Sequence, residues 1–239
     1  MTTMIYGATG AIGGAIARNL VASGNTVHLV GRNAERLQSL ASELGSGATV
    51  GDILDPEVFA RAVADAGAPL QGLVYAVGSI ALKPLGRTSD EDMMQDFRLN
   101  ALGAAQAIRA ALPALKASEQ ASILLFSSVA AGLGFASHAS IAMAKGAVEA
   151  LTRSAAAELA PKIRVNCIAP SLTRTPLSEH LTASEQMSTS LAQMHPLQRL
   201  GEVDDIVGLA ELLLSPKSGW ITGQVIAVDG GRSRLAGKK

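Results

Sequence analysis

The 239-residue sequence has little cysteine, few aromatic residues and no net charge. Its single cysteine, Cys167, excludes a disulfide framework and fits a reducing compartment. Lys plus Arg and Asp plus Glu each number 20, so we expect neither nucleic acid nor an anionic membrane as a partner. No apolar run is long enough to span a bilayer. The opening residues MTTMIYGATG lack the pattern of a secretion signal, which predicts a cytoplasmic protein.

Strand and helix patterns alternate along the whole chain. Short apolar or β-branched runs predict buried parallel strands at 4–6, 26–30, 48–50, 72–76, 122–126, 163–168 and 224–228. Helical spacing predicts helices at 11–22, 34–44, 56–64, 91–115, 139–159 and 203–214. The alternation predicts an α/β fold with one domain over 1–239. It is expected to be a Rossmann-like, doubly wound parallel sheet of about seven strands with helices on both faces.

A glycine-rich turn follows the first expected strand. In YGATGAIGGAIARNL, Gly7, Gly10 and Gly13 permit a tight turn and a close approach of the backbone to a pyrophosphate. The next helix offers unpaired N–H groups and the positive end of its dipole. The alternative is a tight turn that binds no ligand. Its place at the start of a βαβ unit favours dinucleotide binding.

Two further motifs follow in order, ILLFSSVAAGLGFASHASIAMAKGAVEALTRSAAAELA at 123–160 and KIRVNCIAPSLTRTPL at 162–177. With the glycine-rich turn, they make the chain similar to the short-chain dehydrogenase/reductase family, especially the 3-oxoacyl-[acyl-carrier-protein] reductases. Ser128 and Lys145 keep the register of the family's catalytic Ser and Lys. Ile141 stands where the family has its proton-donating Tyr.

The resemblance implies roles for the remaining site residues. Ser128 would steady a substrate oxygen, Lys145 would hold the cofactor ribose, and Asn100 would order a water that relays protons to Lys145. Asn100 could alternatively satisfy a distorted helix turn. Because isoleucine cannot donate a proton, either water or His138 has to supply it. His138 lies at the position of the donor Tyr of enoyl reductases, but the dipole at a helix N-terminus disfavours a charged histidine.

The resemblance also implies a nucleotide site and no metal. The residues expected to bind the cofactor are Gly7, Thr9, Gly10, Ala11, Ile12, Gly13, Arg32, Asp52, Ile53, Gly78, Lys145, Pro170, Leu172 and Thr175. Asp52 and Ile53 would hold the adenine, although Asp52 could equally cap a local turn.

Cofactor preference is predicted at the end of the second expected strand. Gly31 and Arg32 stand where an NAD enzyme has an acidic residue, so NADP(H) is favoured over NAD(H). Alternatively, Arg32 is a solvent-exposed side chain at the start of a helix and has no part in cofactor preference.

Three functions remain open from the sequence. The first is an NADP(H)-dependent reductase of a carbonyl or 3-oxoacyl-type small molecule with an atypical proton donor. The second is a catalytically silent dinucleotide-binding protein, either a sensor or a hetero-oligomer subunit. The third is an enoyl-type double-bond reductase. Residues 177–196 are expected to be a substrate lid or a surface helix pair, 231–239 a flexible tail, and the assembly a homotetramer or homodimer.

Overall fold

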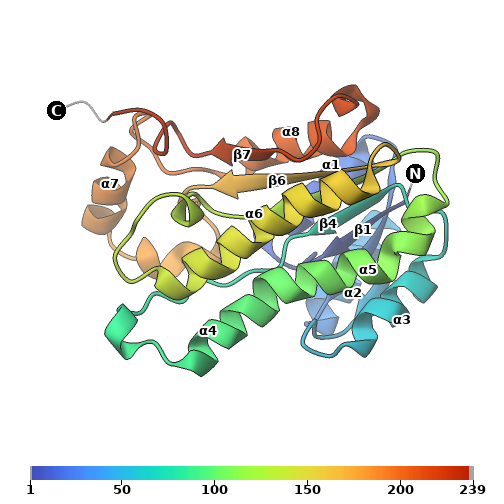
Figure 1. Ribbon diagram of the computed structural model, residues 1–239, viewed down its shortest axis with the longest axis horizontal. Coiled ribbons are helices and arrows are strands. Elements are labelled where there is room, and N and C mark those ends of the chain that lie inside the picture. Colours follow the sequence, from blue (N-terminus) through green and yellow to red (C-terminus); the bar gives the residue numbers. More distant parts are fainter. Residues whose placement is uncertain (1, 237–239) are drawn as a thin grey trace.

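The computed structural model describes residues 2–236, and within them seven parallel strands form one sheet in the order β3-β2-β1-β4-β5-β6-β7. The strands are β1 (Thr2–Tyr6), β2 (Thr26–Gly31), β3 (Gly47–Val50), β4 (Gly72–Tyr75), β5 (Ala121–Phe126), β6 (Ile163–Pro170) and β7 (Val225–Val228). All neighbouring strands run parallel, so their carboxyl ends lie at one edge of the sheet, on the side of α7 in Figure 1.

Helices cover both faces of the sheet. On one face α1 (Ala11–Ala22), α2 (Ala34–Leu44) and α8 (Val203–Leu214) enclose one apolar core. On the other face α3 (Glu57–Ala66), α5 (Gly103–Lys116) and α6 (Ala139–Leu159) enclose the second core, and α4 (Asp90–Phe97) packs on α6. The order of layers is visible in Figure 1. This arrangement confirms the predicted single doubly wound sheet.

Local sequence signals fix where the helices begin and end. The Ser89 side chain accepts from the N–H of Asp92, and the Asp92 carboxylate accepts from the N–H of Ser89, which caps α4 reciprocally. Asn33 caps α2 in a similar way, and the helix ends at Gly45, whose φ of 59° is a conformation that glycine adopts without strain. Pro161 follows the last residues of α6 and cannot continue a helix.

The expected helix at 91–115 is not continuous. A π-helical turn, η2 (Arg98–Leu102), separates α4 from α5 and carries Asn100. The Tyr75 hydroxyl donates to the carbonyl of Leu99 within this turn, at 2.8 Å. Gly103 leaves room for the hydroxyl, since a Cβ there would collide with Tyr75 Oη. Tyr75 therefore supports the distorted turn, which regular helical spacing does not reveal.

Short 3₁₀ segments and one further helix complete the carboxyl edge. They are η1 (Leu85–Arg87), η3 (Val129–Ala131), η4 (Pro176–Leu181) and α7 (Glu185–Gln193), and η5 (Pro216–Ser218) lies before β7. The expected lid, 177–196, comprises most of η4 and all of α7. Between residues 2 and 236, no helix combines the length and apolar character needed to cross a membrane.

The expected tail, 231–239, begins with an ordered turn. The N–H of Ser233 donates to Asp229 Oδ2 at 2.8 Å, and the Arg232 guanidinium lies 4.6 Å from the ring centre of Phe135. Residues 237–239 lie outside the described residues.

Candidate active site

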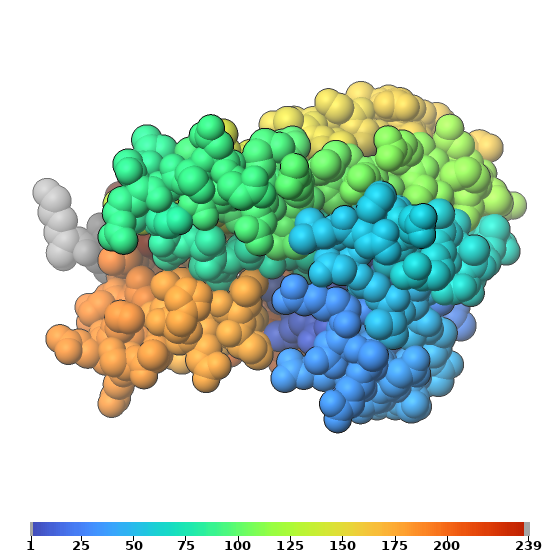
Figure 2. Space-filling view, turned by 90° about the horizontal axis from the view of Figure 1, so that it is seen from below, coloured from blue at the N-terminus to red at the C-terminus, as the bar shows by residue number. Residues whose placement is uncertain are grey.

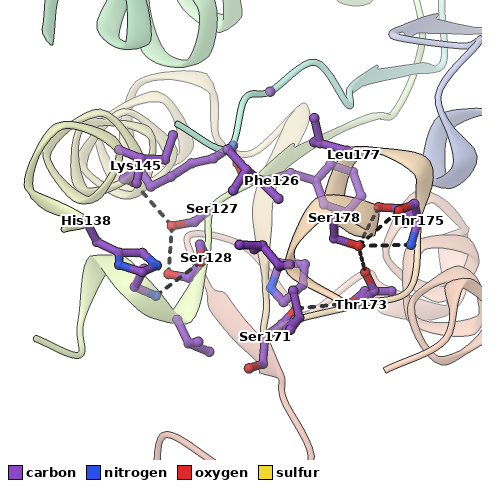
Figure 3. Close-up of a pocket in the computed structure, with 18 of the residues that line it drawn as sticks. Phe126, Ser127, Ser128, His138, Lys145, Ser171, Thr173, Thr175, Leu177 and Ser178 are labelled. Carbon is purple, nitrogen blue, oxygen red and sulfur yellow. Dashed lines mark hydrogen bonds between the residues drawn. The ribbon is translucent and has the colours of Figure 1, made fainter. Parts of the chain in front are cut away.

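A cavity of about 400 Å³ lies at the carboxyl edge of the sheet. It gathers many of the sequence-predicted residues: Ile12, Gly78, Ser128, His138, Lys145, Pro170, Leu172 and Thr175, together with Ile141. Figure 3 shows Lys145, Ser128 and His138 along one side of the cavity and Thr173, Thr175 and Leu177 along the other. In Figure 2 the surface of η4 and α7 (orange) faces the segment before α4 (green) across a crevice.

The other predicted residues lie away from the walls of this cavity. They are Gly7, Thr9, Gly10, Ala11, Gly13, Arg32, Asp52 and Ile53, on the side of β1 and β2, and Asn100 behind Gly78. The cavity thus corresponds to the part of the site where the reaction is expected, and not to the part that is expected to bind the phosphates of the dinucleotide.

Ser128 follows β5 and has a free proton to donate. Its Oγ accepts from the N–H of Ala130 at 3.2 Å, which occupies a lone pair and leaves the hydroxyl proton for a ligand. The neighbouring Ser127 points toward α6, where its Oγ donates to Glu149 Oε1 at 2.9 Å and also lies 3.3 Å from the carbonyl oxygen of Lys145. Ser127 and Glu149, which sequence reasoning missed, therefore fasten the end of β5 to α6.

Lys145 is buried on α6, with 7% of its surface exposed. Its Nζ donates to the carbonyl of Phe126 at 2.9 Å. Burial lowers the pKa of Lys145 to about 8, against an opposite effect from Cys167 and Asp96. A lysine with such a pKa can give up a proton close to neutral pH, which an exposed lysine does poorly.

Ile141 lines the cavity one helical turn before Lys145, and no tyrosine takes its place. The two tyrosines of the chain, Tyr6 and Tyr75, are buried in the core on the α5 side of the sheet. Burial raises the pKa of both phenols, and neither lines the cavity. They cannot supply a proton at Ile141.

His138 borders the cavity at the start of α6. Its Nδ1 lies 2.7 Å from the carbonyl of Ala136, and because a carbonyl only accepts, Nδ1 carries the hydrogen. Nε2 is then the nitrogen left to exchange a proton with a ligand. The ring also meets Phe135 edge-on, with 5.3 Å between ring centres.

Asn100 is fully buried behind the cavity. Its Nδ2 donates to the carbonyl of Asp96 at 2.8 Å and to Ser79 Oγ at 3.2 Å, while its Oδ1 has no protein partner. A Cβ at Gly78 would lie 3.3 Å from both Asn100 Oδ1 and Lys145 Nζ, so these two atoms flank the same glycine. Asn100 thus stabilises a distorted turn and also presents an acceptor toward Lys145.

The turn between β1 and α1 fits the phosphates of a dinucleotide. Gly7 has a φ of 77°, and a Cβ on Gly7 would lie 2.7 Å from the carbonyl oxygen of Ala76. A Cβ on Gly13 would collide with the carbonyl of Gly7. Gly10 supplies no side-chain cap to α1 and the first turn has no acidic residue, so the helix N-terminus can accept an anion.

The residues proposed for the adenosine end have mixed surroundings. Arg32 is exposed directly after β2. Asp52 Oδ1 accepts from the N–H of Leu54 at 3.0 Å. This bond caps a local turn, which is the alternative role predicted for Asp52 from the sequence. Ile53 is buried in the core.

Ser171 and His195 form a pair that sequence reasoning did not find. His195 is buried, its Nδ1 lies 2.9 Å from the carbonyl of Leu191, and its Nε2 lies 2.8 Å from Ser171 Oγ. Since Nδ1 must donate to the carbonyl, Nε2 accepts from Ser171. The pair joins the end of β6 to the end of α7. No periodic pattern in the sequence between the two residues indicates this contact.

Known proteins match this chain over nearly its whole length. Residues 7–233 match the family model described as Enoyl-(Acyl carrier protein) reductase. The chain is 33% identical over 240 aligned positions to a tropinone reductase homolog of Arabidopsis thaliana, covering 96% of this chain and 91% of that protein. It is 34% identical over 230 positions to inactive 2-(S)-hydroxypropyl-CoM dehydrogenase 2 of Xanthobacter autotrophicus, covering 92% of this chain and 100% of that protein.

A solved structure supports the same assignment. A short-chain type dehydrogenase/reductase from Mycobacterium ulcerans matches with a TM-score of 0.92 and 33% identity, covering 99% of this chain and 90% of that one. The chain therefore belongs to the short-chain dehydrogenase/reductase family.

Proposed function

We propose that the protein is an NADP(H)-dependent oxidoreductase that reduces a carbonyl or 3-oxoacyl-type small molecule with an atypical proton donor. One observation carries this proposal: Ser128 and Lys145 face the same cavity, which Ile12 and Thr175 also line. A protein that only binds a dinucleotide has no need of a free serine hydroxyl in that cavity.

Each part of the site has its own role in the proposed reaction. When bound, the dinucleotide supplies a hydride. The phosphates would lie on the turn from Gly7 to Gly13, and the nicotinamide end near Pro170, Leu172 and Thr175. Ser128 donates a hydrogen bond to the substrate oxygen and stabilises the charge that develops there. The apolar cavity wall excludes water, and 177–196 acts as the lid.

Lys145 is the proton donor that the site supports best. Its ammonium is buried at the cavity, and a pKa lowered to about 8 by burial brings it near the range suited to general acid catalysis. His138 Nε2 is the second candidate and a water is the third. Ile141 occupies the position of the usual acid and contributes only shape.

Two other functions each have an observation in their favour. A catalytically silent dinucleotide-binding protein, a sensor or a subunit of a hetero-oligomer, agrees with the apolar Ile141 and with the word "inactive" in the name of one relative. An enoyl-type double-bond reductase agrees with the description of the matching family model and with His138 on the cavity wall. We further propose a cytoplasmic homotetramer or homodimer, as the family typically forms oligomers.

The test is NADPH oxidation with ketones, 3-oxoacyl thioesters and enoyl thioesters, using the native chain, Ile141→Tyr and His138→Ala. We expect slow reduction of a carbonyl substrate by the native chain and a faster rate for Ile141→Tyr. The usual contribution of a general acid, about 10² to 10⁴, is the upper limit of this gain, because Lys145 already donates a proton in the native chain. His138→Ala should leave the native rate unchanged if Lys145 is the donor. Turnover by Ile141→Tyr alone would identify the native chain as silent, and preference for enoyl thioesters would support the third function.

A further inference from the structure

Asp96 is a buried carboxylate next to the site that none of the roles above uses. It lies on α4, ahead of the π-helical turn, with 4% of its surface exposed. Its Oδ1 accepts from Ser79 Oγ at 2.7 Å and its Oδ2 accepts from Ser140 Oγ at 2.6 Å. Burying an ionised carboxylate is costly unless it is hydrogen-bonded, and both oxygens of Asp96 have a donor.

Asp96 is connected to Lys145 through Asn100. Asn100 Nδ2 donates both to the main-chain carbonyl of Asp96 and to Ser79, the residue that Asp96 also holds. With its amide nitrogen fixed on that side, Asn100 presents Oδ1 toward Gly78, which Lys145 Nζ also approaches. The orientation of the Asn100 side chain therefore depends on the pair formed by Asp96 and Ser79.

The second bond of Asp96 reaches the helix that carries the active-site positions. Ser140 is in the first turn of α6, directly before Ile141 and in the turn that precedes Lys145. The bond from Ser140 to Asp96 ties this turn to α4. The Asp96 carboxylate thus holds two parts of the site. One is Asn100, which lies beside Lys145, and the other is the first turn of α6, the helix that carries Lys145.

The charge of Asp96 also acts on Lys145. Burial lowers the pKa of Lys145, and the negative charge of Asp96 on α4 acts in the opposite direction. Cys167 on β6 would act in the same direction as Asp96 only as a thiolate, and its raised pKa keeps the thiol neutral near neutral pH. The remaining titratable or charged groups near Lys145 are Glu149 on α6, which accepts from Ser127, and His138 and Arg232 on the cavity wall.

We propose that Asp96 is a positioning residue for proton transfer at Lys145, which it serves by holding Asn100 through Ser79 and the first turn of α6 through Ser140. This inference rests on the proposed reduction, in which Lys145 donates the proton. In that step the C–H bond of the reduced nicotinamide breaks, a C–H bond forms at the carbonyl carbon, and an N–H bond of the Lys145 ammonium breaks as the alkoxide is protonated. Lys145 then regains a proton from water.

The test replaces Asp96 without changing its shape. Asp96→Asn removes the charge, and Asp90→Asn is the matched control, because Asp90 is an exposed aspartate at the start of the same helix. Titration of the Lys145 side chain by NMR requires no turnover. We expect its pKa to fall in Asp96→Asn and to stay unchanged in Asp90→Asn. An equal Lys145 titration in all three proteins would overturn the proposal.

The kinetic arm separates positioning from structural damage. For Asp96→Asn we expect kcat to fall about 10-fold to 100-fold, less than the loss of a general acid itself, with KM and NADPH affinity unchanged. Because a lower Lys145 pKa means that the ammonium is lost at lower pH, the alkaline limb of the kcat profile should move to lower pH. Ser79→Ala and Ser140→Ala retain the carboxylate, so they should lower kcat with a smaller shift of that limb.

The two proposals can fail separately. If the native chain turns over no substrate, the kinetic arm is run in the Ile141→Tyr background. A shifted Lys145 titration with an inactive native chain would remove the proposed reaction and keep the role of Asp96. An active native chain whose kcat and pH profile are unaffected by Asp96→Asn would remove the role of Asp96 and keep the reaction.

Discussion

In the proposed reaction, Ile141 changes what is required of its neighbour Lys145. With a tyrosine at 141, a lysine would only have to tune a hydroxyl. With Ile141, the apolar wall leaves Lys145 as the buried titratable cation closest to that position, and burial already brings its pKa to about 8. A group that loses its proton in this range works as an acid at neutral pH and stops working in mild alkali.

The proposed cofactor preference also depends on one side chain. Arg32→Ala should weaken NADPH binding about 10-fold to 100-fold, the loss expected for a hydrogen bond to a charged group, because the guanidinium would pair with the 2′-phosphate. NADH binding should change little. The measurement is the dissociation constant of each dinucleotide by fluorescence titration.

Arg36→Ala is the control for Arg32, since Arg36 is also exposed but lies inside α2. It should affect neither cofactor by more than a small factor. Equal weakening of NADPH and NADH by Arg32→Ala would contradict the assignment to a 2′-phosphate.

At the level of elements, periodic patterns predicted most of the fold. The limits of α1, α2, α6 and α8 agree with the helical spacing. For α2 and α6 the local chemistry of Asn33, Gly45 and Pro161 marks the ends. The strands agree to within a few residues at each end, since buried parallel strands are short apolar runs.

Features that depend on contacts between distant residues could not be predicted. The π-helical turn depends on Tyr75 reaching Leu99, and the Asp96 cluster depends on one serine from the loop after β4 and one from α6. Such contacts leave no periodic trace in the sequence. By contrast, Ser128 and Lys145 belong to one local sequence motif, and both line the cavity.

The proposed lid gives a prediction of its own. His195→Ala removes the bond to Ser171 that joins the end of α7 to the end of β6, and also the bond to the carbonyl of Leu191 within α7. This loss should loosen 185–193 by about 1 to 3 kcal/mol, the usual cost of leaving buried partners unsatisfied. Amide hydrogen exchange in α7 should then be roughly 5-fold to 100-fold faster, while β1 and β4 exchange as before. The measurement is hydrogen exchange followed by mass spectrometry.

His180→Ala provides the comparison for His195, because His180 is exposed within η4. It should leave exchange in α7 unchanged. If His195→Ala accelerates exchange across the whole sheet equally, the pair supports the global fold and not the attachment of the lid.

At the scale of the whole molecule, the single thiol of the sequence is fully buried in the sheet. Cys167 lies on β6 with no exposed surface, and burial raises its pKa to about 12. The thiol becomes accessible to solvent only when β6 loses its hydrogen bonds to β5 and β7, that is, when the sheet opens.

Labelling of Cys167 should therefore report unfolding of the entire domain. A thiol reagent should react with the native protein at a rate that follows the global free energy of unfolding as urea is added. Ser190→Cys places a thiol on the exposed side of α7 and should react at once. Fast reaction of Cys167 without denaturant would indicate local opening of β6.

The contact between Tyr75 and Gly103 restricts the order in which this sequence can change. The hydroxyl of Tyr75 fills the space that a methyl group on residue 103 would need, so a larger residue at 103 has to be preceded by a smaller one at 75. The reverse order gives a collision at the turn that carries Asn100. Substitutions at these two positions can therefore be acquired in one order only, position 75 before position 103. Libraries that vary position 103 alone should return only glycine.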